Sequence, residues 1–499
     1  INWSGSVGSG VNTGTIQKTA GIGTFTFNLP FQNNGGTVDV ASGTIAVAGA
    51  FSASGGGLTQ GELRLNGGGT SSGDFVNAGT VVFGGGTHDL NSGADWSGTG
   101  TYRTTAGTVN VNGTATITAT AVELEGGTFG GNGLTTASSS FSWTGGNLQG
   151  AAPGRLIVAT TGTIANGIAL IQIDNGYTLQ NSGTLTWGSG NGGFRINNGS
   201  KLENSGVLDL QHDAQINWSG SAGSVVNAGT VQKTAGTGTS TFGLPFDNSA
   251  GVVDVRTGTV AMTNGFTMSA GAHLKFGIGG TTAGTQHGVL QVSGAGTDTI
   301  DLTGSTLTAY SVGAFTPAAG NTFQVITATT RTGTFSSVNI GFGNGVFLAP
   351  QYNANNVTLA WANAGALQFS AATYPAGESG GTVAITVNRT GGTDGSVAVT
   401  WTATPNTATA ADYSPSGGTV NFADGQTSQT ILIAIAADTL DENDEVFSLA
   451  LSAPTNYAIL GTQTSATVTI ADDDPPPTVA FTTASQSSVD ESGTMMITA

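Results

Sequence analysis

The strongest constraint on the fold is that the chain repeats itself. Residues 1–6 (INWSGS) recur at 216–221, and residues 17–21 (QKTAG) recur at 232–236, both 215 positions later. Residues 29–31 (LPF) keep the same shift and recur at 244–246. A sequence that copies itself at a fixed spacing builds stacked structural units rather than one globular core. We therefore expect a repeat architecture over this part of the chain.

A finer period lies within the long one. A loose pattern of an apolar residue, any residue, Asn, a small residue and Gly recurs along the chain. It is centred on Asn12, Asn33, Asn77, Asn181, Asn204, Asn227 and Asn248. The copies at 181, 204 and 227 are spaced by 23 residues, and those at 227 and 248 by 21. A period of this size, combined with alternating apolar residues, predicts a parallel β-helix whose coils stack about 4.8 Å apart.

The composition agrees with stacked coils. The chain has 82 Gly residues, and only 8% of its residues are charged. Val, Ile, Leu and Phe at alternate positions would face a narrow core, Thr and Ser would face water, and Gly and Asn would occupy turns. The recurring Asn is expected to form a ladder of side-chain amides between coils rather than a ligand-binding row. For Trp3, Trp96, Trp143, Trp187 and Trp218, packing is favoured over a sugar-binding face.

The period fades after residue 275. The stretch 315–323 (FTPAAGNTF), followed by 332–335 (TGTF), resembles the end region of autotransporter-like and haemagglutinin-like passenger domains. That resemblance implies a β-rich cap over the open end of the helix, which an exposed sheet edge needs. The predicted organisation is therefore a parallel β-helix over 1–275 and a capping region over 276–364.

Alternating runs of a different kind follow from about residue 365. Examples are 382–387 (TVAITV), 397–401 (VAVTW), 431–435 (ILIAI) and 466–470 (ATVTI). Short strands at this spacing, separated by turns, predict an Ig-like antiparallel β-sandwich. We assign it to 365–475, and the run at 489–493 (VDESG) predicts that 476–499 begins a second copy, as in a piece of a longer chain.

Acidic residues concentrate in the predicted sandwich. Residues 365–499 hold 14 of the 29 Asp and Glu residues and a single basic residue, Arg389. In a Greek-key sandwich, the loops that carry these acids can gather at one end, where their carboxylates would repel one another unless a cation neutralises them. Ca²⁺ accepts six to eight oxygen ligands with loose geometry, whereas Zn²⁺ would call for His or Cys and Mg²⁺ for a tighter octahedron. The alternative is that the acidic loops only keep the protein soluble.

The same stretch resembles a Calx-beta domain over about residues 367–474. The motifs are AGESG at 376–380, ADY at 411–413, FADGQT at 422–427, DTLDENDE at 438–445 and IADDD at 470–474. The resemblance implies a calcium-binding module, and Ala437 departs from a paired Asp that is frequent in the family. It also implies the calcium ligands, which are Glu378, Asp412, Asp438, Glu442, Glu445, Asp472, Asp473 and Asp474. Asp441 and Asp444 are expected to face solvent.

The function that follows is a non-catalytic, calcium-binding adhesin or structural stalk, secreted or held at a bacterial cell surface, with host or environmental glycans or proteins as candidate partners. The net charge of −18 without a basic face disfavours nucleic acid. The sequence contains no run of about 18 apolar residues, so it predicts no membrane span. The absence of Cys is compatible with export. The alternative is a polysaccharide lyase or glycosidase on the β-helix, whose nearest acid pair would be Glu123 and Glu125.

Overall fold

The computed structural model describes residues 8–188, 190, 192–294, 299–379 and 381–482. The described residues form strands and turns and contain no helix, so the predicted all-β class is confirmed. It follows that the described part of the chain offers no long apolar helix that could cross a membrane. The chain divides into two compact units. The first is Ile1–Ile340 with Leu348–Ala360, and the second is Gly341–Phe347 with Trp361–Ala499.

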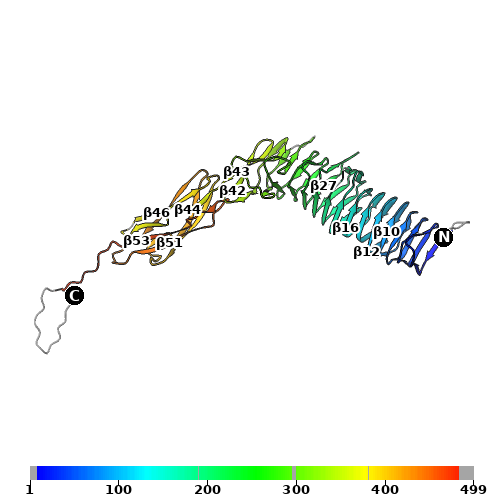
Figure 1. Ribbon diagram of the computed structural model, residues 1–499, viewed down its shortest axis with the longest axis horizontal. Coiled ribbons are helices and arrows are strands. Elements are labelled where there is room, and N and C mark those ends of the chain that lie inside the picture. Colours follow the sequence, from blue (N-terminus) through cyan, green and yellow to red (C-terminus); the bar gives the residue numbers. More distant parts are fainter. Residues whose placement is uncertain (1–7, 189, 191, 295–298, 380, 483–499) are drawn as a thin grey trace, which may run out of the picture. The chain divides into compact units, whose positions relative to one another are not determined.

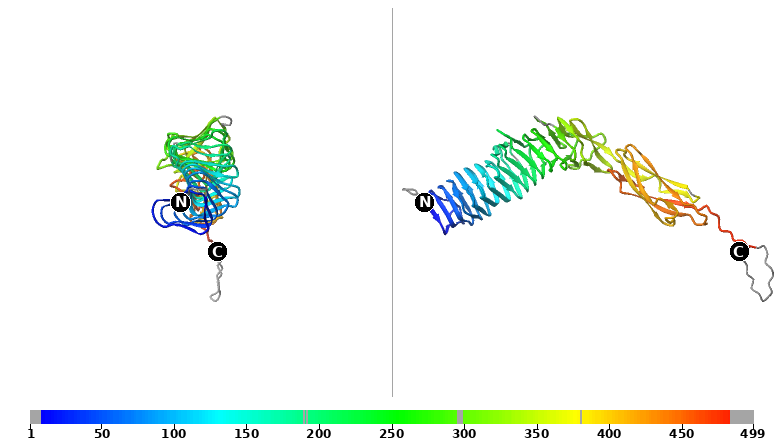
Figure 2. Two further views of the ribbon diagram at one scale, coloured as in Figure 1. Left: turned by 90° about the vertical axis from the view of Figure 1, so that its right-hand side faces the viewer. Right: turned by 180° about the vertical axis from the view of Figure 1, so that it is seen from behind.

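The first unit is a solenoid in which three parallel ladders of strands run from coil to coil (Figures 1 and 2). The first ladder contains β3 (Thr24–Phe27), β5 (Thr44–Val47), β7 (Glu62–Leu65), β10 (Thr80–Phe83), β12 (Asp95–Thr104), β14 (Thr116–Leu124), β16 (Leu134–Trp143), β19 (Thr161–Ile164), β22 (Thr184–Trp187), β25 (Val207–Leu210), β28 (Thr230–Lys233), β31 (Val252–Val255), β34 (His273–Ile278), β37 (Thr306–Ser311) and β40 (Ser337–Asn339). The second ladder shares the long strands β12, β14 and β16 with the first. Its other members are β2 (Thr15–Lys18), the second halves of β4 (Phe31–Val40) and β6 (Phe51–Leu58), β9 (Phe75–Asn77), β18 (Arg155–Val158), β21 (Thr178–Asn181), β24 (Lys201–Asn204), β27 (Ser224–Asn227), β30 (Phe246–Asn248) and β33 (Phe266–Met268). The first half of β4 pairs on one side with β1 (Gly10–Asn12) and on the other with the first half of β6.

The third ladder forms a separate sheet. It contains β8 (Gly69–Ser71), β11 (Thr87–Leu90), β13 (Thr108–Val111), β15 (Thr128–Gly131), β17 (Asn147–Gln149), β20 (Ile171–Asp174), β23 (Phe194–Ile196), β26 (Gln215–Asn217), β29 (Thr239–Phe242), β32 (Thr259–Met262), β35 (Val289–Val292) and β38 (Thr322–Ala328). The predicted parallel β-helix is thus confirmed, and each full coil places one strand in each ladder.

Alternation along each strand explains why the coils close around a core. In β22, Leu185 and Trp187 are buried, whereas Thr184 and Thr186 point outward. Because successive side chains of a strand point to opposite faces, one short apolar alternation per strand is enough to fill the interior. The coil length is less regular than the sequence suggests. Thr80 pairs with Glu62 only 18 positions earlier, while Thr306 pairs with His273, 33 positions earlier.

The recurring Asn residues form the predicted amide ladder. Asn181 Nδ2 donates to Asn204 Oδ1 at 2.7 Å, Asn204 to Asn227 at 2.7 Å, and Asn227 to Asn248 at 2.6 Å. All four side chains are buried. The column begins at Asn181 because Val158 occupies the paired position in the preceding coil, which leaves Asn181 Oδ1 without a hydrogen-bond donor.

The Trp residues of the solenoid divide into two kinds. Trp96, Trp143 and Trp187 are at most 1% exposed and fill the core, as predicted. Trp218 is 41% exposed, so the packing expected for it is wrong. It lies in the turn just after β26, outside the alternation that buries Ile216. Trp3 lies outside the described residues.

Parallel pairing continues into the region for which the sequence predicts a cap. β34 pairs with β37, and β37 pairs with β40, although the coils are now more than thirty residues long. Longer turns hide the period without breaking the ladder, because insertions in a solenoid extend into surface loops. The short strands β36 (Thr299–Asp301) and β39 (Thr330–Thr332) pair within those loops. At the end, β43 (Asn356–Asn363) pairs antiparallel with β38 and covers its free edge.

The second unit is an antiparallel β-sandwich. One sheet contains β44 (Ala366–Phe369), β46 (Gly381–Thr390), β48 (Tyr413–Ser414), β50 (Ser428–Ile435) and β52 (Ile459–Leu460). The other contains β45 (Thr373–Gly377), β47 (Val397–Pro405), β49 (Gly417–Phe422), β51 (Glu445–Ser452) and β53 (Ser465–Ala471). Trp401, Ile433 and Phe447 are among the buried residues between the sheets, and Tyr413 stacks on Phe447 with ring centroids 3.9 Å apart.

The unit also includes part of the hairpin β41 (Gly341–Gly343) and β42 (Val346–Tyr352), whose Phe347 stacks on Tyr457. The predicted second copy at 476–499 falls almost entirely outside the described residues, which end at 482.

Candidate metal centre

The register of the sandwich brings two acidic segments to the same edge. β45 and β53 run parallel, and Gly377 pairs with Ala471. Because the carboxyl ends of parallel strands meet at one edge, Glu378 and Asp472, the next residues along the chain, leave the sheet side by side. The Glu378 N–H donates to the Ala471 carbonyl at 3.0 Å and fixes this approach.

Two further acidic segments reach the same end. β51 begins at Glu445, which pairs with Ile470 of β53, so the loop 436–444 enters at this end of the sandwich. In the other sheet Tyr413 pairs with Ile435, and the Ala436 N–H donates to the Asp412 carbonyl at 2.8 Å. We call this end of the sandwich, formed by residues 378, 412, 436–445 and 472–474, the acidic pole.

Five of the eight predicted ligands form two tight groups. The carboxylate oxygens of Glu378, Asp438 and Glu442 all lie within 4.8 Å of one another, and so do those of Glu378, Asp472 and Asp474. Glu378 belongs to both groups and is only 8% exposed. Its carboxylate accepts no hydrogen bond from any residue that the structure describes. The Glu378 carboxylate lies against four others without a hydrogen-bond donor, so a cation would offset the repulsion among them.

The charges at the acidic pole disfavour ionisation in the absence of a cation. Burial, followed by the nearby carboxylates of Asp438 and Asp472, raises the pKa of Glu378 to about 7. The pKa values of Glu445 and Asp474 are also raised, again by burial first and by neighbouring carboxylates second. No basic side chain offsets them among the described residues of this unit. Arg389 instead donates to the carbonyls of Ala364, Asp394 and Gly395, among others.

The other three predicted ligands lie around the two groups. Glu445 and Asp412 are close enough for Asp412 to be the largest charge acting on the pKa of Glu445. Asp412 is also engaged locally, since its Oδ2 accepts from the Thr409 N–H at 2.6 Å. Asp473 is exposed and belongs to neither group, although its charge acts on the pKa of Asp474.

The sequence does not reveal the part played by Asp444. It is exposed, as expected, yet its Oδ1 accepts from the Asp472 N–H at 3.2 Å. Asp472 Oδ1 in turn accepts from the Glu442 N–H at 3.3 Å. These bonds tie the 436–444 loop to the segment after β53. The two segments come together because β51 and β53 pair in an antiparallel register. The sequence motifs alone do not show which of the acidic side chains accept hydrogen bonds from the backbone.

The donor set of the acidic pole fits a hard divalent cation. It offers carboxylate oxygens from three separate segments, and neither His nor Cys takes part in the two groups. Oxygen ligands in a loose, partly exposed arrangement suit Ca²⁺, whose remaining positions water can fill, better than Zn²⁺ or Mg²⁺.

The acid pair singled out on the solenoid has a different setting. Glu123 and Glu125 both contact Arg103, whose Nε lies 3.3 Å from Glu125 Oε1. Their charges are therefore engaged in a surface ion-pair cluster.

The second unit thus defines a class of module, an antiparallel sandwich whose strand ends converge on a carboxylate-lined pole. Residues 362–474 match the family model of the Calx-beta domain, and this part of the chain is a Calx-beta domain. The resemblance seen in the motifs is confirmed. The first three motifs lie at or beside β45, β48 and β49, and the last two are the segments that meet at the acidic pole.

Curated proteins and solved structures are similar to part of the chain. Extracellular matrix organizing protein FRAS1 of Mus musculus is 33% identical over 121 residues, which are 23% of this chain and 3% of FRAS1. Adhesion G-protein coupled receptor V1 of Danio rerio is 40% identical over 100 residues, which are 20% of this chain and 2% of that receptor. Among solved structures, the apo-form Calx CBD1 domain is 29% identical and has a TM-score of 0.21, with 22% of this chain and 96% of that chain covered.

Proposed function

We propose that the chain is part of a non-catalytic adhesive or structural protein, secreted or exposed at a bacterial cell surface, whose Calx-beta domain binds calcium at the acidic pole. The observation that carries the calcium proposal is the position of Glu378. Its carboxylate belongs to both acidic groups and accepts no hydrogen bond within the described part of the chain. The Calx-beta match supports the same ion.

The bound calcium would act mechanically. Asp472 and Asp474 leave the end of β53, and Pro475, Pro476 and Pro477 follow at once. An ion shared by Glu378, the 436–444 loop and Asp474 would fix the direction in which the chain leaves the sandwich. Pro residues would carry that direction forward, since each restricts its own backbone and that of the residue before it. Calcium would thereby stiffen the path toward whatever follows.

The adhesive role rests on the solenoid and on the relatives. A solenoid presents a long, repeating outer surface, and such surfaces serve as extended binding faces. The two curated relatives are named for extracellular matrix organisation and for adhesion. The ion-paired state of Glu123 and Glu125 favours this non-catalytic role over a polysaccharide lyase or glycosidase.

Thermal unfolding of the full chain against calcium concentration tests the proposal. A ligand that binds only the folded state at ten times its Kd adds about 1.4 kcal/mol of stability. We expect one unfolding transition to rise with calcium, to fall back with a chelator and to respond far less to magnesium. A melting curve that stays unchanged at millimolar calcium would remove the calcium assignment.

A further inference from the structure

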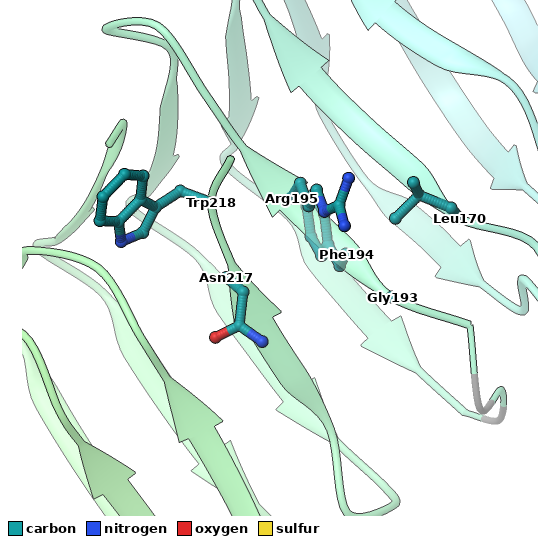
Figure 3. Close-up of a pocket in the computed structure, with 6 residues that line it drawn as sticks. All are labelled: Leu170, Gly193, Phe194, Arg195, Asn217 and Trp218. Atoms are coloured by element: carbon teal, nitrogen blue, oxygen red, sulfur yellow. The ribbon is translucent and has the colours of Figure 1, made fainter. Parts of the chain in front are cut away.

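A hollow of about 490 Å³ opens on the outer face of the third ladder. Figure 3 shows its lining, which is Leu170, Gly193, Phe194, Arg195, Asn217 and Trp218. These residues come from three successive coils, at the start of β20, in and beside β23, and at the end of β26. Phe194 is buried with its side chain toward the core, while Leu170 and Trp218 are exposed.

Trp218 is unlike the Trp residues that fill the solenoid core. Its side chain is 41% exposed, whereas those of Trp143 and Trp187 are at most 1% exposed. Within the described residues its ring stacks on no other aromatic ring, and its Nε1 makes no hydrogen bond. The indole therefore presents a broad apolar face and a free N–H donor to solvent. Such rings are typical of binding faces, because they combine a large contact area with a polar handle.

Arg195 supplies a charge beside that ring. The register pairs Arg195 with Asn217 on the next coil, and both side chains point outward because Phe194 and Ile216 point inward. Arg64 and Arg103 each have a carboxylate within 4 Å, but Arg195 has neither an ion pair nor a hydrogen bond in the described part of the chain. Its planar guanidinium keeps five donors in a geometry that suits a carboxylate.

The Asn217 amide completes the set. Its side chain makes no hydrogen bond among the described residues, and the neighbouring coil carries Gly243 beside it. A Cβ at Gly243 would lie 2.3 Å from Asn217 Oδ1, so the glycine leaves the amide the space that it occupies. The hollow therefore gathers an aromatic face, an unpaired cation and a free amide. Successive strands are about 4.8 Å apart, which is the scale of one small ring.

From this combination we propose that the hollow binds an acidic sugar, a uronic acid unit within a glycan. The C–H face of the pyranose ring would lie on Trp218, its carboxylate would accept from Arg195, and a ring hydroxyl would bond to Asn217. An apolar peptide would leave Arg195 unpaired, and free phosphate would leave the indole unused. Because the chain carries a net charge of −18, a glycan with isolated acidic sugars fits better than a dense polyanion. The inference rests on the adhesive part of the proposed function and not on calcium.

Ligand-observed NMR and Trp fluorescence on the full chain test this assignment. The probes are the methyl glycosides of glucuronic and galacturonic acid, each beside its neutral partner, methyl glucoside or methyl galactoside. The measurements are made in a chelator, so that a failure of the calcium site leaves the result unaffected. We expect saturable binding of at least one acid and about tenfold weaker binding of its neutral partner, equal to about 1.4 kcal/mol.

Three variants test whether the sugar binds in the hollow. Trp218→Ala should abolish the fluorescence change while the melting curve stays the same, since the side chain is exposed. Arg195→Gln should remove the preference for the acid over the neutral sugar. Arg155→Gln, an exposed arginine in a different hollow of the solenoid, should bind like the wild type. Equal binding of acidic and neutral sugars, no binding at millimolar sugar, or unchanged binding by the first two variants would overturn the proposal.

Discussion

At the scale of single residues, Glu378 decides the chemistry of the acidic pole. It is the one residue shared by both carboxylate groups, and it is buried by the parallel pairing of β45 with β53. The other acids are exposed or half-buried, so water can screen their repulsion. The repulsion among the carboxylates therefore acts most strongly on the side chain of Glu378.

Replacing Glu378 with Gln should have opposite effects in the presence and absence of calcium. Without calcium at pH 8, the variant should melt at a higher temperature than the wild type, because a charge that the neighbouring carboxylates repel has been removed. With calcium, it should gain much less stability than the wild type does, because a central ligand is lost. Differential scanning calorimetry in chelator and in calcium measures both effects.

Asp424→Asn is the matched control. It removes the same charge, while the retained Oδ1 can still accept from the Gly395 N–H as the carboxylate does. This variant should respond to calcium like the wild type. An equal loss of the calcium response in both variants would point to net charge rather than to the acidic pole.

The raised pKa of Glu378 fixes the sign of a pH effect in the calcium-free protein. The folded-state pKa is about 7, above the ordinary value of 4.5, so the folded state holds a proton that the unfolded state releases. The second unit should therefore lose stability as the pH rises from about 4.5 to about 7 and level off above that. Urea unfolding in chelator at several pH values measures this slope, which Glu378→Gln should flatten. A stability that rises across this window in the wild type would contradict the assignment.

Individual residues also show how much of the candidate site could be predicted from the sequence. The eight acids could be chosen from motifs alone, and the structure brings five of them into two groups. The tie from Asp444 to Asp472 could not be foreseen, because it depends on the register of two distant strands. The packing predicted for Trp218 is wrong for a related reason. Its repeat position suggested packing, but a turn residue just beyond a strand does not follow the alternation of that strand.

At the scale of elements, the Asn column holds the second ladder in register. Asn204 accepts from Asn181 and donates to Asn227, to the Gly206 carbonyl and to the Thr230 carbonyl. Replacing Asn204 with Ala should cost about 1–3 kcal/mol of solenoid stability, because buried donors and acceptors lose their partners. Asn112→Ala, at a surface amide with a long 3.5 Å bond, should cost far less. Denaturant unfolding compares the two, and equal losses would contradict the structural role of the column.

The internal repeat offers a second comparison, because one local sequence occupies two environments. Lys233 is fully buried and donates to Asp213, Ser240 and the carbonyls of His212 and Ala235. Lys18, its copy, is half-buried and bonds to the carbonyls of Ala20, Gly21 and Ser42. The two sites differ in Ser240, whose equivalent in the first copy is Phe25, and in the contacts that Lys233 makes with His212 and Asp213 of the preceding coil.

Lys233→Ala should therefore be the more damaging of two identical substitutions. Losing charge-assisted bonds in a buried site costs about 1.5–3 kcal/mol. Lys18→Ala should cost no more than about 1 kcal/mol, because water can replace its bonds. Chemical denaturation of the two single variants gives the comparison. A larger loss for Lys18→Ala would contradict the greater stabilisation assigned to the buried bonds of Lys233.

The period of the elements was predictable only where turns keep their length. Spacings of 21 to 23 residues are visible because Asn and Gly recur at each turn. Beyond His273 the turns lengthen, and the pairing of His273 with Thr306 leaves no periodic trace in the sequence. Strand pairing survives such insertions because loop length costs little free energy once a ladder is formed.

At the scale of the whole molecule, two kinds of stabilisation divide the chain. The solenoid is stabilised by repetition, with each coil supporting the next through ladders, buried aromatic rings and side-chain amides. The Calx-beta domain has its own core between two sheets, and the calcium that we propose would offset the charge of its acidic pole. We assign calcium to the second unit alone and glycan contact to the first.

Calorimetric titration of calcium into the full chain tests the central claim most directly. We expect saturable binding with a Kd of roughly 10⁻⁴–10⁻³ M, the range of extracellular calcium modules. Binding should be weakened at least tenfold in Glu378→Gln and preserved in Asp424→Asn. Absence of saturable binding, or a Glu378→Gln variant that binds calcium as tightly as the wild type, would contradict it.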